Sequence, residues 1–214
     1  MKRKVAFILV VGLLMVFALS SCGQKDIGAG KAKEFGLAYI NKIFGANETE
    51  ATVSRDIVEC LPYQAGAVVT GDPSIGTRVV YYLRVAKVES MPEYEALING
   101  STGEVYYAWR TELSIKLTEE QIKEASARTS KSWGKNKDLI YEDMRQASIR
   151  WVSENLMDKY PVLFGAQNSD YDKGPINPTF KNSYYVVMQD GTAYEIVMQW
   201  PSMQVLSVSW VNEQ

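Results

Sequence analysis

The stretch YEALINGSTGEVYYAW, residues 94–109, decides the fold that the sequence predicts. Two short runs of strand-forming residues, 94–99 and 104–109, flank a segment rich in Asn, Gly, Ser and Thr. These residue types tolerate the backbone dihedral angles of tight turns. We therefore predict that residues 94–109 form an antiparallel hairpin.

Residues 77–88, upstream of this hairpin, predict a further strand. Apolar and polar side chains alternate along them, and successive side chains of a strand point to opposite faces of its sheet. The apolar set is Val79, Tyr81, Leu83 and Val85, and the polar set includes Arg78, Tyr82 and Arg84. This alternation is typical of an antiparallel sheet with one face buried and the other in water.

An amphipathic helix is predicted before these strands, at residues 31–44. Four apolar residues share one side of it at the helical period, namely Phe35, Ala38, Tyr39 and Ile43. Gly45 then follows as a stop signal. A strand is also predicted at residues 53–61.

The order of helix, strands and hairpin recurs in the second half of the chain. A helix is predicted for residues 138–157, and strands for 183–189, 193–199 and 203–211. A shift of 100 residues places Tyr94-Glu95 on Tyr194-Glu195 and Val105 on Val205. We therefore predict an α+β fold of two tandem units, each an amphipathic helix packed on a small antiparallel sheet.

The first hairpin resembles the closing hairpin of a PepSY-like module. The matching residues are Tyr94, Ile98, Thr102-Gly103-Glu104 and Val105. In the second half Trp200-Pro201-Ser202 replaces the Thr-Gly-Glu turn. The resemblance implies a cystatin-like α+β unit of a secreted, lipoprotein or membrane protein of bacteria. It also implies a role in protease inhibition or in regulation near the envelope, with no catalytic residues.

The N-terminal residues indicate the compartment. Lys2-Arg3-Lys4 precede an apolar run over residues 5–19, which is short for a membrane-spanning helix. The run ends in Leu19-Ser-Ser-Cys22-Gly, which resembles a bacterial lipobox. The resemblance implies a signal peptide at 1–21 and a lipid on Cys22, which would anchor the protein on the extracytoplasmic side of the cell membrane.

The remaining chain divides by composition. We predict a flexible tether at 22–30, a first PepSY-like unit at 31–117, a short helix and polar linker at 118–137, and a second unit at 138–214. The short helix opens with Thr118-Glu-Glu-Gln121, a capping box. Residues 160–180 contain three prolines and predict an irregular stretch.

The charge and the rare residues restrict the function. Three of the 23 basic residues and none of the 25 acidic ones precede Cys22, so the rest of the chain carries a net charge of −5. This mildly acidic body argues against binding nucleic acid. The chain has no histidine, the commonest general base and metal ligand, and Cys60 is its only cysteine after Cys22. We therefore predict a protein that is not an enzyme and has no cofactor.

One loop has the spacing of a calcium site. Oxygen-bearing side chains alternate from Asn168 to Gly174, but the glycine is displaced by one position and Thr179 stands where the closing glutamate belongs. We interpret this segment as a solvated acidic loop and predict no metal.

The aromatic residues of the first hairpin predict a contact surface. Strand alternation places Tyr107 and Trp109 on the buried face with Val105. Glu104, Tyr106 and Arg110 then share the outer face, where an exposed tyrosine among charges suits recognition of a protein partner. We predict a non-catalytic binding module that regulates or inhibits another envelope protein. The alternative is a ligand- or cell-wall-binding lipoprotein with a pocket between the two units.

Overall fold

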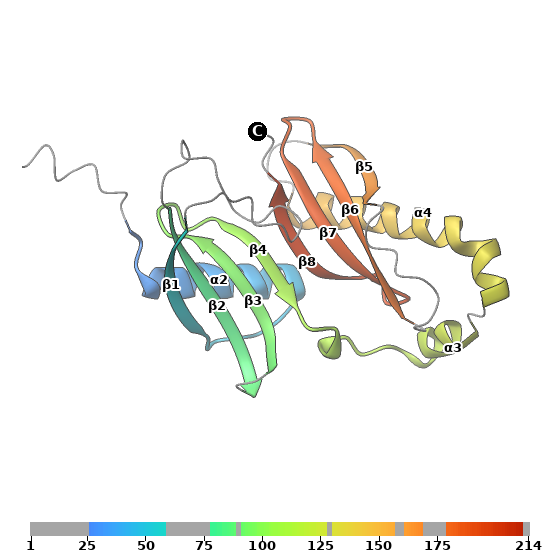
Figure 1. Ribbon diagram of the computed structural model, residues 1–214, viewed down its shortest axis with the longest axis horizontal. Helices are drawn as coiled ribbons and strands as arrows, with labels where there is room; N and C mark the ends of the chain where they lie inside the picture. The colour runs from blue at the N-terminus through green and yellow to red at the C-terminus, as the bar shows by residue number, and fades with distance from the viewer. Residues whose placement is uncertain are drawn as a thin grey trace, which may run out of the picture.

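The computed structural model describes residues 26–58, 78–88, 91–127, 130–156, 161–168 and 179–211. In chain order the elements are α2 (Ala29–Phe44), β1 (Thr52–Val58), β2 (Arg78–Val88), β3 (Met91–Asn99), β4 (Val105–Arg110), the 3-10 turn η2 (Glu112–Ser114), α3 (Glu119–Ala127), α4 (Ser130–Asn155), β5 (Val162–Asn168), β6 (Phe180–Met188), β7 (Ala193–Trp200) and β8 (Gln204–Val211) (Figure 1). The α+β class predicted from the sequence is confirmed.

All eight strands of the described residues belong to one antiparallel sheet with the order β1-β2-β3-β4-β8-β7-β6-β5. The sequence predicted a small sheet for each unit, but the two sets of four strands join edge to edge. Three residue pairs make this join: Tyr107 with Ser209, Ala108 with Val208, and Trp109 with Ser207. The protein therefore has a continuous sheet in place of two separate small ones.

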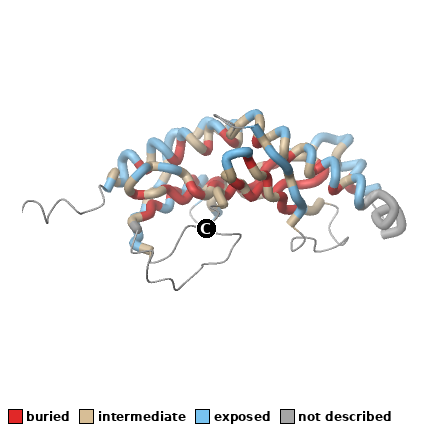
Figure 2. Tube along the Cα trace, turned by 90° about the horizontal axis from the view of Figure 1, so that it is seen from above, coloured by how far each residue is buried: buried red, intermediate tan, exposed pale blue. Residues whose placement is uncertain are grey.

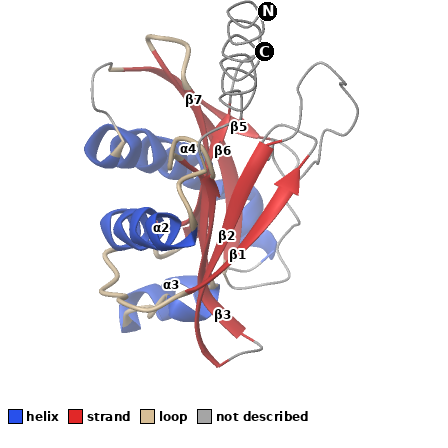
Figure 3. Ribbon diagram, turned by 90° about the vertical axis from the view of Figure 1, so that its left-hand side faces the viewer, coloured by secondary structure: helices blue, strands red, loops and turns tan. Residues whose placement is uncertain are grey.

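The helices α2 and α4 pack on the same face of this sheet, α2 on β1–β4 and α4 on β5–β7 (Figure 3). Their buried side chains join one core, in which Ala32 and Ile40 come from α2 and Met144 and Val152 from α4. Figure 2 shows the buried residues as a band that follows the sheet through both halves. The opposite face of the sheet carries neither of these helices.

The buried side of α2 agrees with the prediction at Ile43, which is buried, but differs from it at two other positions. Phe35 and Ala38 are exposed, whereas Ala32, Gly36 and Ile40 are buried. A Cβ atom on Gly36 would lie 2.7 Å from Cδ1 of Leu83, so a larger residue at this position would require the Leu83 side chain to move. Because this contact involves a glycine, the spacing of large apolar residues does not predict it.

Two further boundaries differ from the prediction. The helix α4 begins at Ser130, within the segment predicted as a polar linker. Residues 162–168, predicted as irregular, form the edge strand β5. The burial of β5 does not alternate regularly, and Gly165 lies against Ile149 of α4, so the strand lacks the period-two pattern by which strands are found. The predicted capping box is confirmed, since Thr118 and Gln121 exchange side chain to backbone hydrogen bonds.

The two closing hairpins have the same register at an offset of 100 residues. Tyr94 pairs with Arg110 as Tyr194 pairs with Trp210, and this correspondence holds along both hairpins. Both also contain a register shift at the same place, after Leu97 and after Val197. Each half consists of one helix followed by four consecutive antiparallel strands.

Arg110 fastens the join between the halves. Its side chain is buried, and its Nε donates to the carbonyl oxygen of Val205 at 2.7 Å while Nη2 donates to Gln204 Oε1 at 2.8 Å. The guanidinium carbon also lies 5.3 Å from the centre of the Phe44 ring at the end of α2. Burial lowers the pKa of this guanidinium. Arg110 thus connects β4 and α2 of the first half to the start of β8 in the second.

We expect Arg110→Met to lower the free energy of unfolding by about 1–3 kcal/mol, because it leaves the buried Val205 carbonyl without this donor. Arg150→Met, on the exposed surface of α4, is the matched control and should unfold close to the parent protein. Urea denaturation of the three proteins makes the comparison. Equal stability of the two variants would show that Arg110 does not fasten the join.

Candidate functional site

The contact surface predicted around Tyr106 is largely buried. Glu104 is exposed, as predicted, but Tyr106 is only 4% and Arg110 only 8% exposed. The Tyr106 ring stacks on Trp210 at 5.9 Å between centroids, and Asn99 donates a hydrogen bond to its hydroxyl. The predicted exposure of Tyr106 and Arg110 is therefore wrong.

The register shift in β3–β4 explains this error. Ile98 pairs with Val105 and Leu97 with Tyr107, so Tyr106 is an extra residue without a counterpart in the register of β3. The simple alternation of faces ends at such a bulge. Tyr106 packs with Val80 and Leu97, away from the core under the helices, and Arg110 lies opposite the buried Tyr94.

The outward residues of the first half are found by the cross-strand register. Tyr81, Leu83 and Val85 of β2 pack in the core under the helices, so the residues between them point to the other face. Tyr82 pairs with Leu97 and Arg84 with Glu95, and these continue to Tyr107 and Trp109 on β4. We call Tyr82, Arg84, Glu95, Tyr107 and Trp109 the outer patch.

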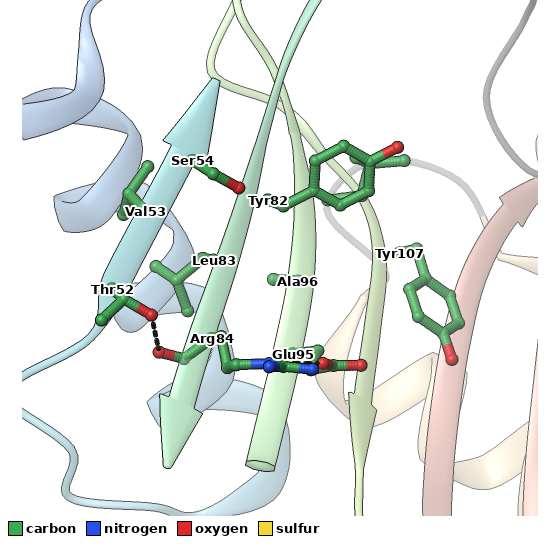
Figure 4. Close-up of a pocket in the computed structure, with 10 residues that line it drawn as sticks. Thr52, Val53, Ser54, Tyr82, Leu83, Arg84, Glu95, Ala96 and Tyr107 are labelled. Atoms are coloured by element: carbon green, nitrogen blue, oxygen red, sulfur yellow. Dashed lines mark hydrogen bonds and ion pairs between the residues drawn. The ribbon is translucent and has the colours of Figure 1, made fainter. Parts of the chain in front are cut away.

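The outer patch borders a shallow hollow of about 460 Å³ on β1–β4 (Figure 4). Its polar and aromatic lining comprises Thr52, Ser54, Tyr82, Arg84, Glu95 and Tyr107. Tyr82 is 42% exposed, and Arg84 Nε lies 3.0 Å from Glu95 Oε1 in an ion pair that solvent reaches. The aromatic rings offer a partner apolar area to bury, and the fixed pair of opposite charges beside them favours one orientation of that partner.

Exposed apolar side chains continue the outer patch toward the adjoining ends of β2 and β3. Trp109 lies opposite Glu95 and borders a second hollow of about 370 Å³, with Val88, Met91 and Leu113 around it. These three aliphatic side chains are between 61% and 78% exposed. Contiguous exposed apolar surface of this kind marks interaction sites more often than isolated residues do.

The equivalent face of the second half is closed. Glu195 and Ser183 are buried, and Glu195 Oε1 accepts hydrogen bonds from Ser183 Oγ at 2.5 Å and from Asn168 Nδ2 at 3.3 Å. Tyr185 lies opposite Glu195, where the first half has Arg84 opposite Glu95. The face of the first half is thus the accessible one. The sequence signal for this face was the polar set of residues 77–88, which the contact surface predicted around Tyr106 did not include.

Asp26 fastens the start of the described chain to the first half. Its carboxylate accepts hydrogen bonds from the Tyr81 hydroxyl at 2.5 Å, from Arg55 Nε at 2.9 Å and from the Gly28 amide at 2.9 Å. These donors, with that of Tyr81 foremost, lower the pKa of Asp26 from 3.8 to about 2. The next residue, Ile27, donates its amide to the Gly100 carbonyl at 2.8 Å. We call this set of contacts the Asp26 clamp.

The remaining predicted sites lie mostly outside the described residues, including Cys22, Cys60 and positions 169–174 of the acidic loop. Within the described ranges, no cluster of three or more His, Cys, Asp or Glu residues could hold a metal ion. No helix among the described residues combines the length and the apolar character needed to cross a membrane.

No protein-family model and no curated protein matches the chain. Among solved structures, the chain is similar to the Bacillus megaterium YpeB C-terminal domain, with 10% sequence identity and a TM-score of 0.42. The aligned region covers 86% of this chain and 63% of that chain. The function proposed for this chain therefore rests on its own residues and their geometry.

We expect carboxyl NMR titration to place the pKa of Asp26 near 2 and Tyr81→Phe to raise it toward 3.8, since the first of the three donors is removed. Because the folded-state pKa is the lower one, the stabilisation by this carboxylate is complete above about pH 4 and is lost as the pH falls through 2. Glu142, whose pKa Arg145 lowers to about 2, is the internal control and should not change. An unchanged Asp26 titration in Tyr81→Phe would contradict the clamp.

Proposed function

We propose that the protein is a non-catalytic binding module of the cell envelope, which regulates or inhibits another envelope protein through its outer patch. The observation that carries this proposal is the exposed aromatic and charged surface around Tyr82, Arg84 and Glu95, on the face of the sheet opposite α2 and α4. Protein interfaces are enriched in tyrosine, tryptophan and arginine, which the outer patch combines.

The extent of this surface favours a macromolecular partner. The hollow on β1–β4 continues through Trp109 to the exposed Val88, Met91 and Leu113. A small ligand would fill one hollow and leave the aliphatic side chains in water. A protein segment lying along β3 and β4 can cover both hollows and bury their apolar area.

The repeated register supports the tandem architecture. Each of the five cross-strand pairs of β3–β4 has a counterpart in β7–β8 at an offset of 100 residues, and the register shift is at the same place. We therefore propose two units of the same type, as the hairpin resemblance to PepSY-like modules suggests. The closed face of the second unit makes it the structural support of the first, whose face remains accessible.

The lipid on Cys22 belongs to the same proposal. The basic residues, the apolar run and the Leu-Ser-Ser-Cys sequence agree with a lipoprotein signal, which supports anchoring on the extracytoplasmic side of the cell membrane. A dual acyl anchor of this kind holds a protein at a bilayer durably.

A second candidate function is ligand binding, for example of a cell-wall glycan. A hollow of about 460 Å³ with two tyrosines and the hydroxyls of Thr52 and Ser54 has the size and mixed character of a small-molecule site. This hollow lies on β1–β4 alone, whereas the sequence analysis expected a pocket between the two units.

Photo-crosslinking in cells tests the proposal. We expect a photoreactive residue in place of Tyr82, which is 42% exposed, to form an adduct with one envelope protein. The same residue in place of Leu139, which is exposed on α4 across the sheet, is the control and should give no such adduct. An identical pattern at both positions would remove the outer patch as a protein contact. Thermal stabilisation by glycan fragments would then favour the ligand-binding alternative.

A charge exchange gives a finer test of the same contact. Arg84→Glu combined with Glu95→Arg retains an ion pair within the protein but reverses the charges that the partner meets. We expect the purified double variant to keep its unfolding midpoint while its affinity for the crosslinked partner falls at least about tenfold. Unchanged affinity would place the contact elsewhere.

A further inference from the structure

The Asp26 clamp removes most of the freedom expected of the tether. Asp26 contacts Arg55 of β1 and Tyr81 of β2, and Ile27 contacts Gly100 at the end of β3. Three strands of the first half therefore hold two consecutive residues. Residues 26–30, which the sequence assigned to a flexible tether, are part of the folded body, and α2 begins at Ala29.

The length of chain before the clamp limits its distance from the anchor. Only Gly23, Gln24 and Lys25 separate Cys22 from Asp26. At about 3.5 Å per residue this segment spans at most roughly 14 Å. If Cys22 carries the lipid, Asp26 lies no farther than this from the residue at the membrane surface.

The position of the clamp in the sheet then decides which half is near the bilayer. The clamp is on β1 and β2, at one end of the strand order, and β5 is at the other end. Neighbouring strands are about 4.8 Å apart, so seven steps place β5 roughly 34 Å from β1. The outer patch lies on β2–β4, in the same half as the clamp.

The net charge of the protein does not provide a second attachment to the membrane. Without the residues before Cys22 the chain carries a net charge of −5, so an anionic lipid surface does not attract it as a whole. The short segment between the lipid and the clamp then limits which part of the body can lie close to the membrane.

We infer that the clamp holds the first half, with its outer patch, beside the bilayer, and that the partner is an integral membrane protein recognised through a segment close to the membrane surface. This inference rests on the proposed function, because it requires the lipid on Cys22 and binding by the outer patch. It excludes a partner that is reached only far from the membrane, at the distal edge of the second half.

Energy transfer from single labels to the bilayer tests the orientation. The full-length lipidated protein, with Cys60→Ser, is reconstituted in phosphatidylcholine vesicles that contain a headgroup-labelled acceptor lipid. A donor dye is attached either to Thr102→Cys in the β3–β4 turn or to Leu163→Cys on β5, both at exposed positions. We expect transfer at least about twofold higher from position 102, given the four to five strand spacings, roughly 22 Å, between the β3–β4 turn and β5. Equal transfer, or higher transfer from position 163, overturns the inference.

Asp26→Ala is the matched variant for the clamp. It removes the contacts to Tyr81 and Arg55 but leaves the lipid and the outer patch unchanged, so the difference in transfer between the two positions should shrink. An undiminished difference shows that the clamp does not set the orientation. Adding phosphatidylglycerol to the vesicles should leave the transfer values unchanged, whereas a large change would show attachment by charge.

The fate of the crosslinked partner separates this inference from the proposed function. The partner is identified from the Tyr82 adduct by mass spectrometry, and the uncrosslinked partner is then tested by alkaline carbonate extraction, because the lipid on Cys22 would itself retain any adduct in the membrane. A partner that resists this extraction is an integral membrane protein and supports both. An adduct with a protein that carbonate extracts supports the proposed function but overturns the inference. Vesicle binding that persists in Cys22→Ser refutes the lipid anchor, and the inference with it, independently of the crosslink.

Discussion

The pairing of β4 with β8 is the constraint on which the rest of the structure depends. Three residue pairs join two sets of four strands, and Arg110 extends the join to the first residues of β8 and to the end of α2. Because the inner edges of the two sets pair with each other, β1 and β5 become the ends of one sheet. The same join aligns α2 and α4 on one face, so that a single apolar core runs under both helices.

The two halves have the same register but different outer faces. Glu95 and Glu195 occupy equivalent positions, yet the first pairs with Arg84 at the surface and the second is buried with Ser183 and Asn168. A buried carboxylate needs hydrogen-bond donors to remain stable, and neutral donors meet this need in the second half. The surface pair costs the fold little and remains accessible to a partner. Small changes on two hairpins of matching register thus leave the face of the first half accessible and close that of the second.

The sequence predicted what depends on local chemistry and missed what depends on close packing. Alternation in residues 77–88, turn residues in the hairpins and the capping box at Thr118 each act within a few residues, and the structure has the elements they predict. Gly36 is buried because α2 approaches Leu83 closely, which no local pattern reveals. Likewise, the bulge at Tyr106 depends on the partner strand, so counting alternate residues placed Tyr107, Trp109 and Arg110 on the wrong face.

In the outer patch, the residues suited to provide affinity for a partner differ from those suited to provide specificity. Arg84 and Glu95 already satisfy each other, so a partner that covers them must replace the water around both charges and gains little net free energy from the pair. The tyrosine rings and the exposed aliphatic side chains near Trp109 lose no such hydration, and their burial supplies the favourable free energy. The ion pair instead fixes which charges a partner can present above β2 and β3. A surface of this kind discriminates against partners of the wrong charge pattern, as the proposed regulatory role requires.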